Sequence, residues 1–349
     1  MYKLSSKLLK RQVSMPSNYL HLDPFLSAGD AENMLSIAQS FGSFGTYADE
    51  ATSDTLGEEL PQRFDVVINY MNQGLDGAGN SDPPEIAASR TNYFRETYAY
   101  GNDIKVAGIE AFLEHPELSR GAQLISGCSN VVPAIVYANL LIPGQELAIH
   151  TDVPEFRGAN RKSVPQWLLV VMLHSGLFEK WRIPIVTCVS WFGGHKGGAF
   201  SFYPDGADGE KCAVAARHNS AILTDTDTTF HGVQRVTGGL PDLPRIGQAA
   251  RLHFCGGNNW ELRDSEDVIG SFSWSSLRYS ISWKAYCFED DEAEALWRSG
   301  IDTLSIDEIL STLEASLRER GLLKGFRPSP TEFALLLVSS FVTFPAAAA

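Results

Sequence analysis

Paired cysteines are missing from this chain of 349 residues. The cysteines number five, and no two of them stand in C-x-x-C spacing; they are Cys128, Cys188, Cys212, Cys255 and Cys287. This pattern argues against a disulfide framework and against a zinc ribbon, and it is typical of a reducing compartment. We therefore expect a cytoplasmic protein. The stretch before Asp23 has four basic residues and no acid, which gives a weaker indication of a mitochondrial transit peptide.

An excess of positive charge is missing as well. The formal net charge at pH 7 is −14. Nucleic acid and anionic membrane surfaces both require a positive face on their partner, so we expect neither as a partner. No apolar run reaches the roughly 18–20 residues of a membrane span, and the C-terminal run from Phe333 to Phe344 is too short. A hydrophobic content of 44% indicates a globular protein with a buried core.

Two motifs of common enzyme classes are also missing. The stretch GGHKGG, residues 193–198, lacks the spacing and the Lys-Ser/Thr ending of a phosphate-binding loop, so we interpret it as a turn. Ser201 and Ser220 lack the G-x-S-x-G context of a serine hydrolase. The chemistry must therefore come from other residues.

Short β-rich runs, separated by Pro-Gly, Gly-Gly and Asp-Gly turn signals, fill the middle of the chain. They are VVPAIVYANLLIPGQELAIHTD, PQWLLVVMLHSG, IPIVTCVSWFG, GGAFSFYP, AVAARHNSAILTDTD, FHGVQRVTG and ARLHFCGG. Short strands at this spacing predict a β-sandwich or a jelly roll. Helical periodicity predicts a helix that starts near Ser27, another over residues 104–119, and an amphipathic helix after a Ser305 cap.

A histidine and an aspartate stand two residues apart at the end of one of these runs, in LAIHTD. In an extended segment residues i and i+2 point to the same face, so His150 and Asp152 should project side by side. His231, in TTFHGV, supplies a second imidazole. Two imidazoles and one carboxylate can occupy one face of an octahedral metal and leave three positions open, which suits non-haem Fe(II) and oxygen chemistry. The alternative is a hydrogen-bonded His-Asp pair in the core with an unrelated His231.

In this order the motifs resemble the Fe(II)/2-oxoglutarate-dependent oxygenase superfamily. NLLIPGQELAIHTD is similar to the strand, Pro-Gly turn and ligand strand of prolyl-hydroxylase-like members, and GGAFSFY is similar to their GGxLxFY strand. HNSAILTDTDTTFHGV resembles the segment that leads to the distal histidine, and HLDPFLSAGDAENMLSIAQ loosely resembles the opening strand and helix. The resemblance implies that His150, Asp152 and His231 are the metal ligands and the catalytic centre.

The resemblance also implies the fold and its boundaries. We expect an α+β, mainly β fold with a double-stranded β-helix (jelly roll) core and flanking helices at the N- and C-terminal ends. Residues 1–349 would form a single oxygenase domain. Its jelly-roll core would span about 130–257, with helical N-terminal support over 20–125 and a C-terminal helical extension over 285–349.

The implied reaction uses Fe(II), 2-oxoglutarate and O2 to remove hydrogen from a C–H bond, with release of succinate and CO2. Hydroxylation, desaturation and cyclisation all remain open. We expect a small-molecule substrate, an amino-acid derivative or a biosynthetic intermediate. The alternatives are a protein or peptidyl hydroxylase of the same superfamily and a non-catalytic metal-binding jelly roll. The sequence leaves the oligomeric state open.

The resemblance implies a basic residue for the far carboxylate of 2-oxoglutarate, near the start of the strand after the distal histidine. Arginine suits this role because its planar fork binds a carboxylate through two hydrogen bonds. Arg251, at the start of RLHFCGG, is our first candidate, and Arg245 is the second. Tyr137 and Asn139 alternate on one face of AIVYANLL, where family members contact the co-substrate; polar side chains that are satisfied within the core are the alternative.

Two further positions are candidates for substrate contact. Arg157 lies with Arg161 and Lys162 in the loop after the metal strand, where a cation would suit a substrate carboxylate; a solvated loop is the alternative. Phe344 ends the apolar C-terminal run, which we expect either to cover the mouth of the site or to pack on the outside of the jelly roll.

Overall fold

The structure is a computed structural model, and it describes residues 18–47, 60–73, 82–238 and 243–346. The N-terminal arm before residue 18 and part of the polar stretch over 52–90 lie outside the described residues. In the described part, no helix combines the length and the apolar character that crossing a membrane requires.

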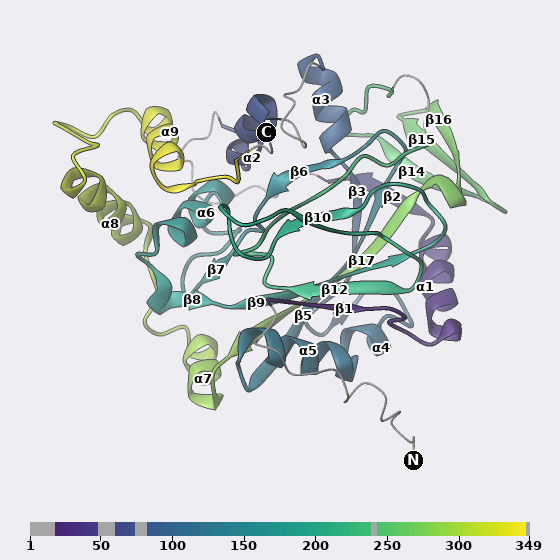
Figure 1. Cartoon of the computed structure of the whole chain (residues 1–349), viewed down its shortest axis with the longest axis horizontal. Helices are drawn as coiled ribbons and strands as arrows, with labels where there is room; N and C mark the ends of the chain where they lie inside the picture. The colour runs from purple at the N-terminus through teal and green to yellow at the C-terminus, as the bar shows by residue number, and fades with distance from the viewer. Residues whose placement is uncertain (1–17, 48–59, 74–81, 239–242, 347–349) are drawn as a thin grey trace.

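Two antiparallel sheets form the centre of the molecule (Figure 1). The large sheet contains, in spatial order, β1 (Tyr19–Leu22), β12 (Ser220–Thr224), β9 (Ile185–Phe192), β17 (Arg278–Phe288), β5 (Asn130–Leu141), β3 (Phe94–Tyr100), β2 (Ser43–Thr46), β14 (Arg251–Gly256), β15 (Asn259–Asp264) and β16 (Asp267–Ser273), with β4 (Asp103–Ile104) beside β3. The small sheet contains β11 (Cys212–Val214), β10 (Phe200–Tyr203), β13 (Phe230–Val233) and β6 (Leu147–His150). A third, two-stranded pair joins β7 (Glu155–Phe156) to β8 (Arg182–Ile183).

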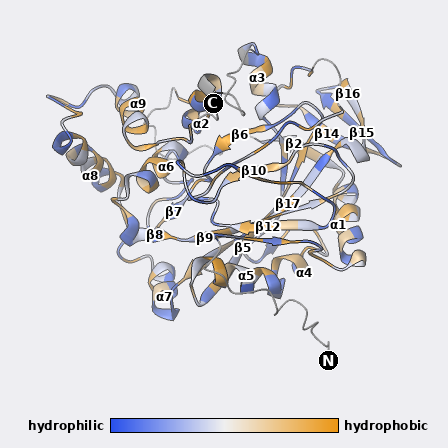
Figure 2. Cartoon of the chain, in the orientation of Figure 1, coloured by the Kyte–Doolittle hydropathy of each residue, from blue (hydrophilic) through white to orange (hydrophobic). Residues whose placement is uncertain are grey.

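The small sheet packs on the β12-β9-β17-β5 part of the large one, and together they form the expected jelly roll. Trp191 of β9 and Ile222 of β12 share an apolar cluster with Phe200 and Phe202 of β10. Leu141 of β5 meets residues of β13 in the same way. Strands β6 and β10 are mainly hydrophobic along their length (Figure 2).

The jelly-roll core is longer than the predicted span of 130–257. Its last strand, β17, is inserted between β5 and β9, whereas β14 to β16 extend the outer edge of the large sheet. The predicted C-terminal extension from residue 285 therefore begins within a strand. The strand after the distal histidine in the sequence is not the strand that completes the jelly roll.

Helices cover the outer face of the large sheet and one end of the molecule (Figure 1). The helices are α1 (Ala28–Phe41), α2 (Phe64–Gln73), α3 (Pro84–Thr91), α4 (Glu110–Leu113), α5 (Pro116–Ser126), α6 (Gln166–Ser175), α7 (Asp291–Ser299), α8 (Ile306–Glu319) and α9 (Pro330–Phe341). The Ser27 and Ser305 side chains cap α1 and α8 as predicted. The single helix predicted over residues 104–119 is instead two, because Pro116 starts a new helix, α5.

The run PQWLLVVMLHSG, predicted as a strand, is the helix α6. Eight consecutive residues of α6, from Gln166 to Leu173, are buried. A helix that is apolar all round shows no period of 3.6, so its pattern does not distinguish it from a buried strand. Helices α8 and α9 pack beside α6 in a second apolar cluster.

Candidate metal centre

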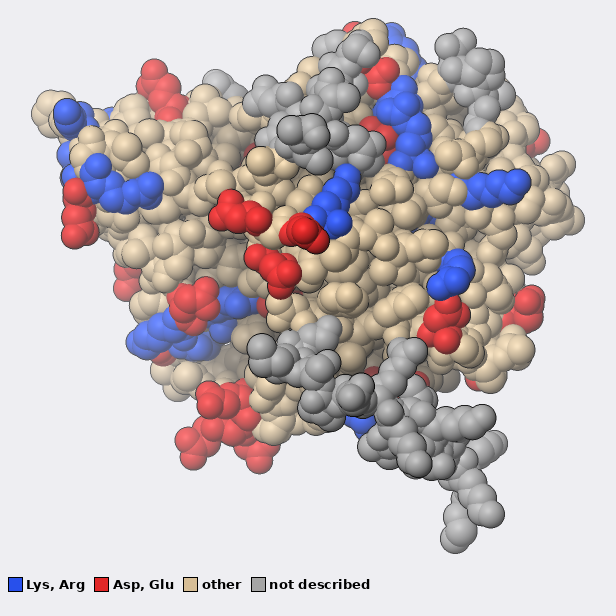
Figure 3. Space-filling view, in the orientation of Figure 1, with Lys and Arg blue, Asp and Glu red and all other residues tan. Residues whose placement is uncertain are grey.

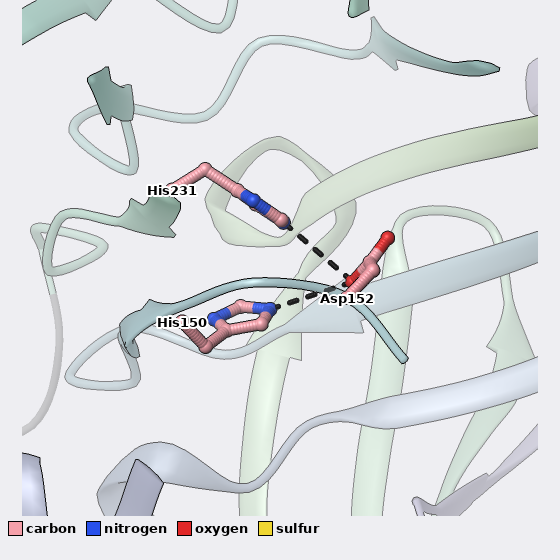
Figure 4. A group of neighbouring side chains, drawn as sticks. All are labelled: His150, Asp152 and His231. Carbon is pink, nitrogen blue, oxygen red and sulfur yellow. Dashed lines mark ion pairs between the residues drawn. The ribbon is translucent and has the colours of Figure 1, made fainter. Parts of the chain in front are cut away.

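His150, Asp152 and His231 converge on one point (Figure 4). His150 is the last residue of β6, His231 pairs with it from the neighbouring strand β13, and Asp152 follows two residues after His150. The Nε2 atoms of His150 and His231 lie 3.6 and 3.7 Å from Oδ1 of Asp152. One ligand atom from each residue lies within 4.8 Å of the other two. The predicted spacing of two along a strand therefore brings the three side chains together.

Backbone carbonyls fix how the two imidazoles point. Nδ1 of His150 lies 2.7 Å from the Ala148 carbonyl oxygen, and Nδ1 of His231 lies 2.9 Å from that of Thr229. A carbonyl only accepts, so each Nδ1 carries the proton and each Nε2 keeps its lone pair for the centre. Burial and the neighbouring His150 lower the pKa of His231 to about 3, so the ring is neutral at pH 7, the form that binds metals.

The Asp152 carboxylate is held on one side only. Its Oδ2 accepts hydrogen bonds from Lys284 Nζ at 2.6 Å and from Thr226 Oγ1 at 2.7 Å. Oδ1 is left facing the two histidines. Burial opposes the charged form, but the charge of Lys284 outweighs it and holds the pKa of Asp152 well below its usual range.

These three residues fit an octahedral Fe(II) better than a structural zinc. The group contains two imidazoles and one carboxylate, and in the described part of the chain no fourth His, Cys, Asp or Glu completes it. Structural zinc sites are closed by four protein ligands, whereas a two-histidine, one-carboxylate face leaves positions for small ligands. The donor set therefore suits a reactive iron.

A cavity of about 690 Å³ opens beside the centre. His150, Asp152 and Lys284 line it, and so does Tyr137, one of the two polar residues predicted on β5. Asn139, the other one, is outside this lining; its Oδ1 is buried, and no donor among the described residues reaches it. Tyr137 and Asn139 thus lie on the predicted face of β5, but of the two only Tyr137 lines the cavity.

The structure does not bring Arg251 or Arg245 to this cavity. Arg251 starts β14, which pairs with β2 at the outer part of the large sheet, and it forms hydrogen bonds with Ser43 and with Glu96 at 2.8 Å. Arg245 is 71% exposed and pairs with Glu85. Both arginines lie away from the cavity because β14 to β16 form the outer edge of the large sheet. The chain after β13 therefore leaves the interior of the jelly roll.

The sequence analysis missed a buried arginine at the start of β17. Arg278 is 2% exposed. Its Nε donates to the Gly198 carbonyl at 2.8 Å, its Nη1 lies 3.4 Å from Ser280 Oγ, and its buried Nη2 has no hydrogen-bond partner in the described structure. Burial without an acidic partner lowers the pKa of Arg278 to about 9.

Gly198 makes room for this guanidinium. A Cβ at Gly198 would lie 2.5 Å from Cδ of Arg278, and the residue has a φ of +64°, so only glycine fits there. One signal in the sequence could have revealed the strand. In RYSISWK, which starts at Arg278, charged or hydroxyl residues alternate strictly with apolar ones, and this places Arg278 and Lys284 on one face.

Arg157 and Phe344 lie away from the cavity lining. Arg157 pairs with Asp302 at 3.1 Å. The Phe344 ring contacts Phe230, the neighbour of His231, with ring centroids 5.5 Å apart. Helix α9 packs on α6, so the C-terminal run forms apolar core outside the jelly roll, and no residue over 333–344 lines the cavity.

No protein-family model and no curated protein matches the sequence. Among solved structures, the chain is similar to SnoK, a non-haem α-ketoglutarate-dependent carbocyclase of nogalamycin biosynthesis, at 12% identity over 83% of this chain and 90% of that one, with a TM-score of 0.42. It is similar to the epimerase SnoN of the same biosynthesis at 11% identity over 78% and 79%, with a TM-score of 0.40. A prolyl hydroxylase from Trichoplax adhaerens, in complex with a peptide fragment, matches at 12% identity over 80% and 87%, with a TM-score of 0.36. Identities this low identify neither substrate nor reaction.

Proposed function

We propose that the protein is an Fe(II)- and 2-oxoglutarate-dependent oxygenase that acts on a C–H bond of a small molecule. The observation that carries the proposal is the three-ligand centre, in which both Nε2 atoms and one carboxylate oxygen face a common point. When bound, the iron with 2-oxoglutarate and O2 supplies the oxidising power that removes hydrogen from the substrate carbon.

His150, Asp152 and His231 would hold the iron. Each is oriented before any metal binds: Ala148 and Thr229 fix the imidazoles, and Lys284 with Thr226 fixes the carboxylate. Such supporting contacts orient ligands and raise metal affinity. Because Lys284 neutralises Asp152 only through Oδ2, Oδ1 remains a ligand.

Arg278 would hold the far carboxylate of 2-oxoglutarate, the role expected of Arg251. It starts the strand that completes the jelly roll, it lies on the same strand face as Lys284, and its buried charge lacks a protein counter-charge. Leaving a buried charge unpaired is unfavourable, and a carboxylate in a guanidinium fork relieves it. Asn139 faces Ser280 across the pairing of β5 with β17, so its free Oδ1 belongs to the same interior.

The cavity supports a small-molecule substrate. Its volume of about 690 Å³ lies within the range of roughly 300–1,000 Å³ typical of small-ligand sites. The substrate would enter beside His150 and Asp152, while Arg278 keeps the co-substrate deeper in the jelly roll. This separation places the C–H bond next to the metal positions that the protein leaves open.

An anaerobic spectrum tests the proposal. The purified chain is loaded with Fe(II) and titrated with 2-oxoglutarate, and chelation of the iron should produce a weak visible charge-transfer band. Admission of O2 should then release succinate. His231→Ala, which removes one ligand, is the matched control and should show neither signal. Iron binding without the band and without succinate would contradict the proposal.

A further inference from the structure

Two arginines in the cavity lack an acidic partner. The guanidinium of Arg95, on β3, contacts three tyrosines: it lies 3.7 Å from the ring centroid of Tyr137 and 5.0 Å from that of Tyr47, and it shares a hydrogen bond with Tyr93. Arg161, in the loop after β7, also lines the cavity. No carboxylate of the described residues lies within salt-bridge distance of either.

Several other charged groups around the cavity are paired. Lys284 pairs with Asp152 and Arg63 with Asp65. Two carboxylates of the lining are engaged as well: Glu96 pairs with Arg251 at 2.8 Å, and Glu155 accepts a hydrogen bond from Tyr286 at 3.1 Å. Asp103, Lys105 and Lys162 also line the cavity. Among the described residues, Arg95 and Arg161 therefore have no carboxylate that neutralises them, although the whole chain carries a net charge of −14.

Most arginines outside the cavity have a carboxylate partner, although Arg320 has none among the described residues. On the face shown in Figure 3, basic and acidic side chains lie close together in small groups. Arginines elsewhere on the surface, such as Arg217 and Arg298, have carboxylate partners at 2.9 and 2.8 Å. Arg95 and Arg161 thus line the same cavity, and neither has a carboxylate partner among the described residues.

We propose that Arg95 and Arg161 bind an oxyanion group, carboxylate or phosphate, of the substrate, which is therefore an anionic small molecule. This inference rests on the proposed function, and it specifies the substrate class. Two guanidinium forks can bind one oxyanion through several charged hydrogen bonds. Because the group is fixed beside His150 and Asp152, it holds a neighbouring carbon at the metal.

Tyrosines give this subsite an aromatic wall. Tyr47 and Tyr93 stack with ring centroids 5.2 Å apart and an interplanar angle of 8°, and Tyr137 covers the other side of Arg95. Flat apolar groups pack well against such rings. An aromatic anion is therefore a suitable probe of the subsite.

The test compares three probes of similar shape. The full chain, loaded with Zn(II) and saturated with 2-oxoglutarate, is titrated by calorimetry with phenylacetate, with phenyl phosphate and with the neutral phenylacetamide. At least one anion should bind roughly tenfold or more tightly than the amide, as expected for a charged hydrogen bond in a half-buried site. The tighter of the two anions indicates whether the substrate group is a carboxylate or a phosphate.

Variants locate the binding site. Arg95→Gln and Arg161→Gln should each remove most of the preference for the anion, whereas Arg245→Gln, which removes a surface arginine outside the cavity, should keep it. Equal binding of anions and amide by the wild type would overturn the inference. So would a preference that survives in both cavity variants, or a loss in these variants of 2-oxoglutarate binding rather than of probe binding.

Zinc does not support turnover, so this result is independent of the proposed reaction. A protein that binds the anions but never releases succinate as the Fe(II) form would refute the proposed function alone. A protein that releases succinate but shows no preference for anions would refute the subsite alone.

Discussion

The start and the middle of β17 each place a cation inside the jelly roll, and the surroundings of the two cations differ. Lys284 lies 2.6 Å from Oδ2 of Asp152. Burial opposes its charge, but the carboxylate outweighs burial and raises the pKa of Lys284 above its usual value. Arg278, six residues earlier on the same face, forms hydrogen bonds with a carbonyl and a hydroxyl and has no carboxylate partner among the described residues, and burial lowers its pKa to about 9.

This difference distinguishes Lys284, a cation that stabilises the protein itself, from Arg278, a cation that we expect to bind a ligand. The chain supplies the counter-charge for Lys284, because Asp152 must stay ionised and oriented whether or not metal is bound. It supplies none for Arg278, and the counter-charge we assign there is a carboxylate of 2-oxoglutarate. A pocket can bind a charged co-substrate tightly only if its own charges are not already neutralised.

The largest expected effect is at the centre near Lys284. His150→Ala, Asp152→Ala and His231→Ala should each abolish succinate release and reduce bound iron, because each removes one of three protein ligands. The two histidine variants should keep the fold, since each side chain can be shortened without breaking a strand, whereas Asp152→Ala also leaves Lys284 without its carboxylate and should lower stability. Iron content, turnover and circular dichroism check this. A variant with near wild-type turnover would show that its residue is not a ligand.

Removal of the paired cation should destabilise the protein strongly. Lys284→Met leaves Asp152 buried without its partner, and breaking a buried ion pair in this way costs about 3–5 kcal/mol. The free energy of unfolding of the metal-free protein, from urea titration, measures this. Asp152→Asn in the same background should recover part of the loss, because the buried charge is then gone; no recovery would mean that the pair is not the cause.

The corresponding change at the start of β17 should affect the free energy of unfolding in the opposite direction. Arg278→Met removes an unpaired buried charge, so without 2-oxoglutarate the free energy of unfolding should stay unchanged or rise by about 1 kcal/mol. The same urea titration measures it. A loss as large as that of Lys284→Met would show that Arg278 is a structural charge, and the comparison would fail.

A gradual effect concerns the pH dependence of stability near Arg278. Burial, and then the charge of Arg278, lower the pKa of His195 to about 3, so folding keeps this ring neutral. Between about pH 6.5, where the unfolded histidine titrates, and pH 3, stability should therefore fall as the pH falls, by about 1.4 kcal/mol per pH unit from this group. His195→Asn should reduce that slope, and an unchanged slope would exclude His195 as a contributor.

The metal centre could be predicted from the sequence because its geometry is local. Two residues on one strand share a face whatever the rest of the chain does, so His150 and Asp152 needed only a strand, and β13 supplies His231 beside them. The jelly roll followed from short strands between turn signals. The helix α6 could not be recognised, because burial on all sides removes the helical period from its sequence.

The anchor for the co-substrate could not be predicted from position in the chain. Arg251 starts the next β-rich run after His231, but its strand pairs outside the jelly roll, and only long-range pairing shows that β17 takes the interior position. Arg95 and Arg161 come from segments that are distant in the sequence. That neither has a carboxylate partner among the described residues depends on tertiary packing, and no pattern in the sequence indicates it.

The account is tested most directly by 2-oxoglutarate titration of the Fe(II)-loaded protein without oxygen, followed through the visible charge-transfer band. Arg278→Gln should weaken 2-oxoglutarate binding by roughly ten- to a hundred-fold, since a charged hydrogen bond contributes roughly 1.5–3 kcal/mol, and should leave iron binding unchanged. Arg251→Gln should bind 2-oxoglutarate as the wild type does. If Arg251→Gln shows the loss and Arg278→Gln does not, the assignment of the unpaired arginine of β17 to the co-substrate is contradicted.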